Sequence, residues 1–169
     1  MSPKILLSLA ISLCSLTPTF AGLKWVDFGV NGLTCSMCSR SVEMSLKRLD
    51  FIDNVVMDLE TTEGRIFFKP NLPVDLHSIA KAVVNSGFSV RFVRLQVSFD
   101  DMTLNPDGSF TLHGQDFMWI DFQNKVNGPV ALKLLDENFL PKKESAEWKK
   151  KLLASKSSDQ KVLHVVQQG

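Results

Sequence analysis

Residues 25 to 50 have the sequence WVDFGVNGLTCSMCSRSVEMSLKRLD. The stretch begins as a strand over Lys24 to Val30, because apolar side chains occupy every second position there. A turn at Asn31-Gly32 follows, and then a helix is predicted over Ser36 to Asp50. Its apolar side chains recur at intervals of three and four, so that one face carries Cys38, Val42, Leu46 and Leu49.

Further strand and helix patterns follow this unit. They are a strand at Ile52 to Glu60, a turn at Glu63-Gly64, a strand at Arg65 to Lys69, a helix over Leu76 to Val84 capped by Asp75, and a strand at Phe88 to Val97. The order β-α-β-β-α-β, with right-handed crossovers, gives an antiparallel sheet with both helices on one face. The predicted class is α+β, with a ferredoxin-like βαββαβ sandwich over residues 23–97.

Residues 98–169 have a different pattern of short strands and turns. They predict a small β-rich C-terminal unit with one helix, for which a barrel is one candidate arrangement. The features are turns at Asn105 to Gly108 and Asn127-Gly128, strands at Phe117 to Phe122, Val130 to Leu135 and Val162 to Val166, and a helix at Glu144 to Ala154. Nothing in this segment predicts its role.

The first 21 residues are typical of a secretory signal peptide. Lys4 precedes an apolar run from Ile5 to Leu16, and Thr19 and Ala21 stand three residues and one residue before a cut after Ala21. A buried helix or a retained anchor is the alternative. Cleavage would remove Cys14, leave a mature chain without a membrane span, and predict a secreted or periplasmic protein.

The charge balance favours no polyanionic partner. Lys and Arg number 19 and Asp and Glu number 18, so no excess of positive charge indicates nucleic acid or an anionic membrane surface. The sequence also offers no Ser-His-Asp arrangement and no glycine-rich phosphate loop. We therefore do not expect an enzyme.

The sequence Gly32-Leu33-Thr34-Cys35-Ser36-Met37-Cys38 joins the first strand to the first helix. We expect Thr34 to cap that helix, whose amino end would stabilise thiolates on Cys35 and Cys38. Two soft thiolates select Cu(I) and other thiophilic ions, whereas structural zinc needs four ligands. In an oxidising compartment the same pair either forms a disulfide or is kept reduced by a metal.

This motif, the element order and a late Ser86-Gly87-Phe88 resemble the heavy-metal-associated domain over Lys24 to about Val97. That family includes copper chaperones, amino-terminal domains of copper-pumping ATPases and a periplasmic mercury-binding protein. The resemblance implies that Cys35 and Cys38 are the metal ligands and that Phe88 covers them. The chain departs from the family at Leu33, where the family usually has a Met that packs beneath the loop.

The predicted function is therefore an exported carrier that exchanges Cu(I) with a metal-donor or metal-acceptor protein. A mercury-binding protein and a thiol–disulfide oxidoreductase are the alternatives, because the same two thiols could serve either. Met37 is more simply an exposed residue than a third ligand. The three histidines, His77, His113 and His164, are far apart in the sequence and are expected at the surface or hydrogen-bonded within the fold. The oligomeric state is not predicted.

Overall fold

The computed structural model describes residues 23, 25–70, 72–99, 102–123, 126, 128–154 and 162–168. The predicted signal peptide, with Cys14 and the cut after Ala21, lies outside the described residues, as does Asn127 of the second predicted turn. No helix among the described residues combines the length and the apolar character that a bilayer span requires.

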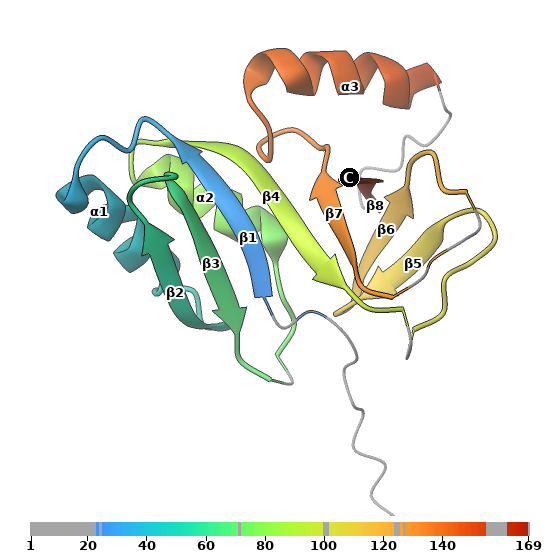
Figure 1. Cartoon of the computed structure of the whole chain (residues 1–169), viewed down its shortest axis with the longest axis horizontal. Coiled ribbons are helices and arrows are strands. Elements are labelled where there is room, and N and C mark those ends of the chain that lie inside the picture. Colours follow the sequence, from blue (N-terminus) through green and yellow to red (C-terminus); the bar gives the residue numbers. More distant parts are fainter. Residues whose placement is uncertain are drawn as a thin grey trace, which may run out of the picture.

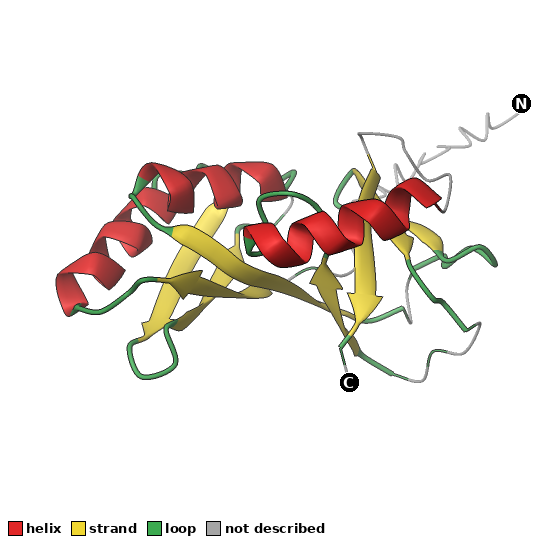
Figure 2. Cartoon of the chain, turned by 90° about the horizontal axis from the view of Figure 1, so that it is seen from above, coloured by secondary structure: helices red, strands yellow, loops and turns green. Residues whose placement is uncertain are grey.

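The first half of the chain forms the predicted sandwich. Its elements are β1 (Trp25–Asn31), α1 (Ser36–Leu46), β2 (Ile52–Asp58), β3 (Glu63–Phe68), α2 (Leu76–Asn85) and β4 (Ser89–Val97). The strands lie in the order β2-β3-β1-β4, and each neighbouring pair is antiparallel. Helices α1 and α2 cover the same face of this sheet (Figure 2). The ferredoxin-like prediction is confirmed.

The core of this half lies between the two helices and the sheet. Alternate residues of β1 point into it, so Val26 and Phe28 have no exposed surface. Val42 and Leu46 of α1 are equally buried, as predicted from their spacing. Asp75 caps α2 as expected, because its carboxylate accepts the backbone N–H groups of His77 and Ser78.

The predicted turn at Glu63-Gly64 is wrong, because both residues belong to strand β3. The chain reverses before them, where Thr62 has a φ of 54°. A glycine is needed at position 64 because neighbouring side chains leave no room for a Cβ atom, and not because the chain turns there. A Cβ atom there would lie 2.7 Å from both Met57 Sδ and Phe28 Cε1.

The residue that caps the amino end of helix α1 is Cys35 and not Thr34, so the predicted cap is wrong by one residue. Cys35 has an extended backbone, with φ −148° and ψ 155°, and its Sγ accepts the backbone N–H of Cys38 at 3.2 Å. A side-chain acceptor at this position satisfies one of the amide groups that a helix leaves unpaired at its amino end. The first cysteine is therefore also the residue that starts the helix.

The second half adds β5 (Ser109–Leu112), β6 (Gln115–Trp119), β7 (Val130–Leu134), α3 (Lys142–Ala154) and β8 (Val162–Gln167). The predicted β-rich unit with one helix is present, but its strands do not form a separate barrel. They extend the first sheet to eight strands in the order β2-β3-β1-β4-β7-β8-β6-β5 (Figure 1). Strand β6 pairs with β8 in parallel, and β7 pairs with both of its neighbours in antiparallel fashion.

Strand β4 joins the two halves because it is nine residues long and has a partner on each edge. Its last four residues pair with β7, and this places Leu95 opposite Leu132, both without exposed surface. Phe139, between β7 and α3, is also fully buried, and its ring centroid lies 5.4 Å from that of His77 on α2. The second half is thus packed against the first half, through the sheet and through α2.

We expect Leu132→Ala to lower the free energy of unfolding by about 2–5 kcal/mol, because it leaves a cavity at the joint between β4 and β7. The matched control is Leu59→Ala, which removes the same atoms from a residue that is 56% exposed and should cost less than about 0.5 kcal/mol. Urea denaturation measures both values. Hydrogen exchange in Leu132→Ala should show protection lost in β1 as well as in β8; loss in β8 alone would contradict a shared core.

The cap at Cys35 generates a second prediction, for the reduced protein. Cys35→Ser keeps a side-chain acceptor and Cys35→Ala removes it, so the alanine variant should be less stable by about 0.5–2 kcal/mol. Cys38 provides the matched control, since it packs against the core and should tolerate alanine at least as well as serine. Equal stability of the two Cys35 variants in urea denaturation would show that the cap contributes nothing.

Candidate metal centre

The two cysteines lie where strand β1 passes into helix α1. The strand ends at Asn31, and Gly32 follows with a φ of +83°, a backbone conformation that favours glycine. Leu33 is then buried, with 8% of its surface exposed, and anchors the loop to the core. The expected role of Leu33 beneath the loop is confirmed, and the residues after it project toward solvent.

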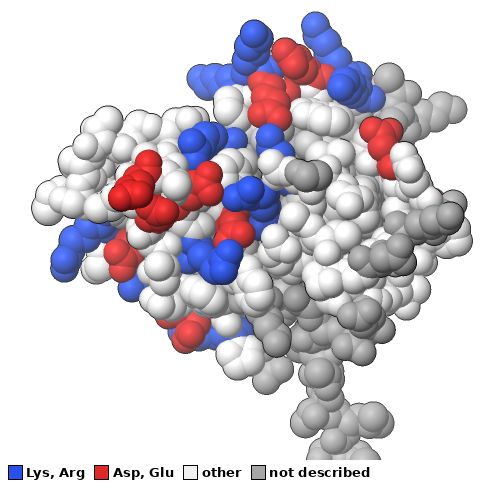
Figure 3. Space-filling model, in the orientation of Figure 1, with Lys and Arg blue, Asp and Glu red and all other residues white. Residues whose placement is uncertain are grey.

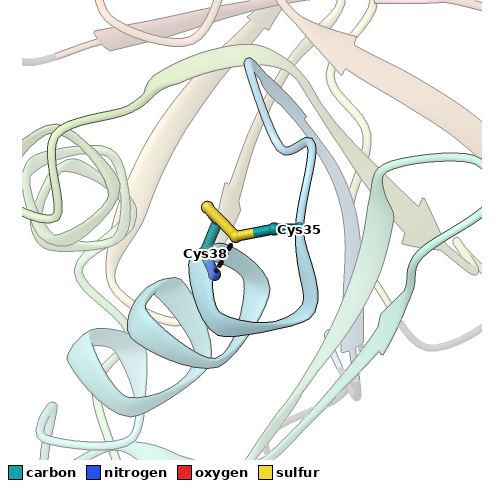
Figure 4. Close-up of a disulfide and its surroundings, with 2 residues drawn as sticks. All are labelled: Cys35 and Cys38. Atoms are coloured by element: carbon teal, nitrogen blue, oxygen red, sulfur yellow. Dashed lines mark hydrogen bonds between the residues drawn. A yellow bond between two sulfur atoms is a disulfide. The ribbon is translucent and has the colours of Figure 1, made fainter.

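Cys35 and Cys38 converge on one another and are joined by a disulfide (Figure 4). Their Cα atoms are 5.3 Å apart. Cys35 is exposed, whereas Cys38 is half-buried and packs against the core. Cross-linking two residues separated by two others closes a very short loop and adds little stability. The importance of the pair therefore lies in its chemistry, either as a dithiol or as a disulfide.

The amino end of α1 gives the two sulfur atoms a positive local environment. Backbone N–H groups of the first turn point toward the loop, and the Cys38 N–H already donates to Cys35 Sγ. The partial positive charge of a helix amino terminus favours thiolate over thiol once the disulfide is reduced. Arg40, one turn along, has an exposed side chain.

Phe88 lies in the turn between α2 and β4 and faces the start of the cysteine loop. A Cβ atom built on Gly32 would lie 3.9 Å from Phe88 Cδ1. The neighbouring Asn31 Nδ2 donates to Ser89 Oγ at 3.4 Å, which ties the two loops together. The structure thus brings Phe88 beside Gly32, and that Phe88 covers the cysteine pair stays a prediction. Met37 is 73% exposed between the cysteines.

The three histidines belong to other parts of the fold. His164 of β8 is buried, and its Nδ1 lies 2.8 Å from Asp136 Oδ1. His77 lies on α2 beside Phe139, and His113 lies in the turn between β5 and β6, where burial lowers its pKa. Among the described residues, no three His, Cys, Asp or Glu side chains gather closely enough to hold a metal ion.

Sequence reasoning missed two features of the structure. One is the Asp136–His164 pair, whose members are 28 residues apart and carry no shared motif. The other is a cleft beside the cysteine loop, lined by Phe88 and by residues at the start of α3. No local pattern predicts it, because the cleft depends on how the second half packs against the first.

Comparison with known proteins places the relationship in the first half of the chain, where residues 27–89 match the family model of the heavy-metal-associated domain. The chain is 38% identical over 66 residues to "Probable copper-transporting ATPase HMA5" of Arabidopsis thaliana, which covers 39% of this chain and 6% of that protein. It is 27% identical over 85 residues to the mercuric transport protein periplasmic component of Pseudomonas fluorescens, covering 50% of this chain and 91% of that protein.

A solved structure, the copper binding domain from HMA7, a P-type ATPase, is 30% identical to this chain. The match covers 40% of this chain and 89% of that chain, with a TM-score of 0.37. The chain spans 6% and 8% of the length of the first two plant ATPases that it matches. The family match, the strand order and the position of the cysteine pair agree, and residues 27–89 of this chain form a heavy-metal-associated domain.

Proposed function

We propose that this protein carries one Cu(I) ion between the thiolates of Cys35 and Cys38 and exchanges it with a metal-donor or metal-acceptor protein. The observation that carries the proposal is the convergence of the two sulfur atoms at the amino end of α1 within a heavy-metal-associated domain. The copper-transporting ATPases among its relatives support copper as the metal. Soft thiolates prefer Cu(I) to hard ions.

The different exposure of the two cysteines suits ligand exchange. An incoming thiolate of the partner binds Cu(I) as a third ligand, one bond from the metal to a cysteine of this chain then breaks, and that sulfur takes up a proton. Cys35 is the exposed ligand and Cys38 is half-buried against the core. Cys35 is therefore the ligand that a partner reaches first, while Cys38 keeps the ion attached during transfer.

Loading with metal requires the reduced pair. The disulfide accepts two electrons and two protons from a dithiol reductant, which becomes a disulfide in turn. Binding of Cu(I) by the two resulting thiols then releases their protons. The protein would therefore bind copper only where such a reductant acts on it.

Export is part of the proposal. Residues 1–21 have the pattern of a cleaved signal peptide. The mercuric transport proteins, of which the alignment covers 91%, are named as periplasmic components. These relatives also make Hg(II) the first alternative metal, since it is thiophilic too.

The disulfide itself favours a second candidate function, that of a thiol–disulfide oxidoreductase. In that case the reduced Cys35 thiolate would attack a client disulfide and release one client thiolate, Cys38 would then displace the second client thiolate from the mixed disulfide, and no metal would be involved. Mixed disulfides with client proteins and reduction of insulin would then be measurable. A copper carrier should show neither activity.

Anaerobic titration of the reduced protein with Cu(I) against a competing chelator tests the carrier proposal. We expect one Cu(I) per chain. Removal of a residue that only hydrogen-bonds to a metal ligand typically lowers the affinity about 10–100-fold, so Cys35→Ser or Cys38→Ser, which removes a ligand itself, should lower it further. Met37→Leu is the matched control, because it removes the third sulfur of the loop and should leave the affinity unchanged.

Three outcomes of such titrations would contradict the proposal in different ways. Equal binding by the double variant Cys35→Ser, Cys38→Ser would place the metal elsewhere. A higher affinity for Hg(II) than for Cu(I), each measured against a competing chelator, would instead favour the mercury alternative. A large effect of Met37→Leu would make the thioether a ligand.

A further inference from the structure

A cleft of about 700 Å³ lies between the two halves, beside the cysteine loop. One wall is formed by the end of α2 and the start of β4, and the other by the segment that leads into α3 and by the first turns of that helix. Helix α3 begins above the first half and runs across to the second (Figure 1). The apolar lining residues are Val84, Phe88, Val90, Leu140, Pro141 and Ala146.

Two residues connect this cleft to the start of the cysteine loop. Phe88 lines the cleft and also faces Gly32 at the start of the cysteine loop. Asn31 lines it as well and hydrogen-bonds Ser89 across the two loops. A partner seated in the cleft would therefore be next to the loop that carries Cys35.

The floor of the cleft is apolar and partly open to solvent. Val84 is 51% exposed and Phe88 is half-buried, whereas Val90 and Leu140 are buried beneath them. A volume of about 700 Å³ is within the range of sites that hold a ligand or a few side chains. The cleft can thus accept an apolar side chain of a partner.

The α3 wall is basic. The helix carries five lysines and two glutamates, and one of these, Glu144, is already paired with Lys133 of β7 at 2.7 Å. Lys142 and Lys149 line the cleft together with one acid, Glu137, whose Oε2 is 3.8 Å from Lys149 Nζ, and both of these side chains are largely exposed. Basic side chains, with acidic ones between them, lie over α3 along the upper edge of the molecule (Figure 3).

We propose that this cleft docks an acidic segment of the metal-exchange partner, with an apolar side chain of that segment on Val84 and Phe88 and its carboxylates on Lys142 and Lys149. The inference rests on the proposed carrier function, because a partner docked in this cleft would lie beside Gly32, at the start of the loop that carries Cys35. The α3 wall comes from the second half of the chain. That half would thereby select which protein receives or supplies the metal.

Three peptides, acetylated and amidated, serve as probes: EDLFDE, its basic counterpart KRLFRK, and EDSSDE without apolar side chains. NMR titration of the ¹⁵N-labelled full chain, with its disulfide intact and without metal, measures their binding. We expect EDLFDE to shift the amide signals of Phe88, Ser89, Leu140 and Ser145. KRLFRK should not bind, and EDSSDE should bind at least about fivefold more weakly than EDLFDE. Added salt should weaken the binding of EDLFDE.

Two charge-reversed variants of α3 separate specific docking from general attraction. Lys142→Glu with Lys149→Glu should weaken EDLFDE at least about fivefold. The control, Lys143→Glu with Lys150→Glu, changes the net charge of the same helix by the same amount at two residues that do not line the cleft. It should have little effect on the binding of EDLFDE. Val84→Asp, at an exposed position, should also weaken binding.

Equal weakening by both double variants, binding of KRLFRK, or shifts confined to another surface would overturn the proposal. Dimerisation that Lys142→Glu with Lys149→Glu abolishes would show that a second copy fills the cleft, and would overturn it too. Cu(I) titration and peptide titration of the unsubstituted protein keep the two proposals apart. Cu(I) binding without EDLFDE binding rejects only the docking site, and EDLFDE binding without Cu(I) binding rejects the carrier function. The charge-reversed variants should bind Cu(I) as tightly as the unsubstituted protein does.

Discussion

The contact of helix α1 with the sheet, through the fully buried Val42 and Leu46, determines where the cysteine pair lies. This contact fixes the axis of the helix, and the cap at Cys35 then fixes its first residue. Both sulfur atoms consequently lie at the amino end of a helix that cannot shift without exposing apolar surface. The site is placed by the core, although Cys35 itself is exposed.

Strand β4 has an equivalent role for the whole molecule. It pairs with β1 on one edge and with β7 on the other, and so joins two segments with different sequence patterns into a single sheet. The fully buried Phe139 adds a contact between the second half and α2. Because of these contacts, the start of α3 lies across a cleft from Asn31 and Phe88, and this cleft has an apolar floor and lysines on its α3 wall.

Much of the first half could be predicted from the sequence, because periodicity reports which face of an element is buried. The strand and helix order, the buried face of α1 and the Asp75 cap are all confirmed. The errors have local causes. Gly64 suggested a turn, but glycine is also required where Met57 and Phe28 leave no room for a Cβ atom.

The sequence could not predict the joint between the halves. Pairing of β4 with β7 connects residues more than 30 positions apart, and the sequence of neither strand predicts which strand it pairs with. The cleft could not be predicted for the same reason, since Phe88 and Lys142 line one cleft only once the two strands have paired. The cysteine pair was visible because its two residues are close in the chain. Their role as metal ligands stays a prediction.

X-ray absorption spectroscopy of the protein loaded with one Cu(I), in buffer free of added thiols, would show whether the two cysteines alone hold the metal. We expect two sulfur neighbours per copper atom and no nitrogen or oxygen neighbours, as two-coordinate binding by Cys35 and Cys38 requires. Nitrogen neighbours from histidine, or three sulfur neighbours in a monomer, would contradict it.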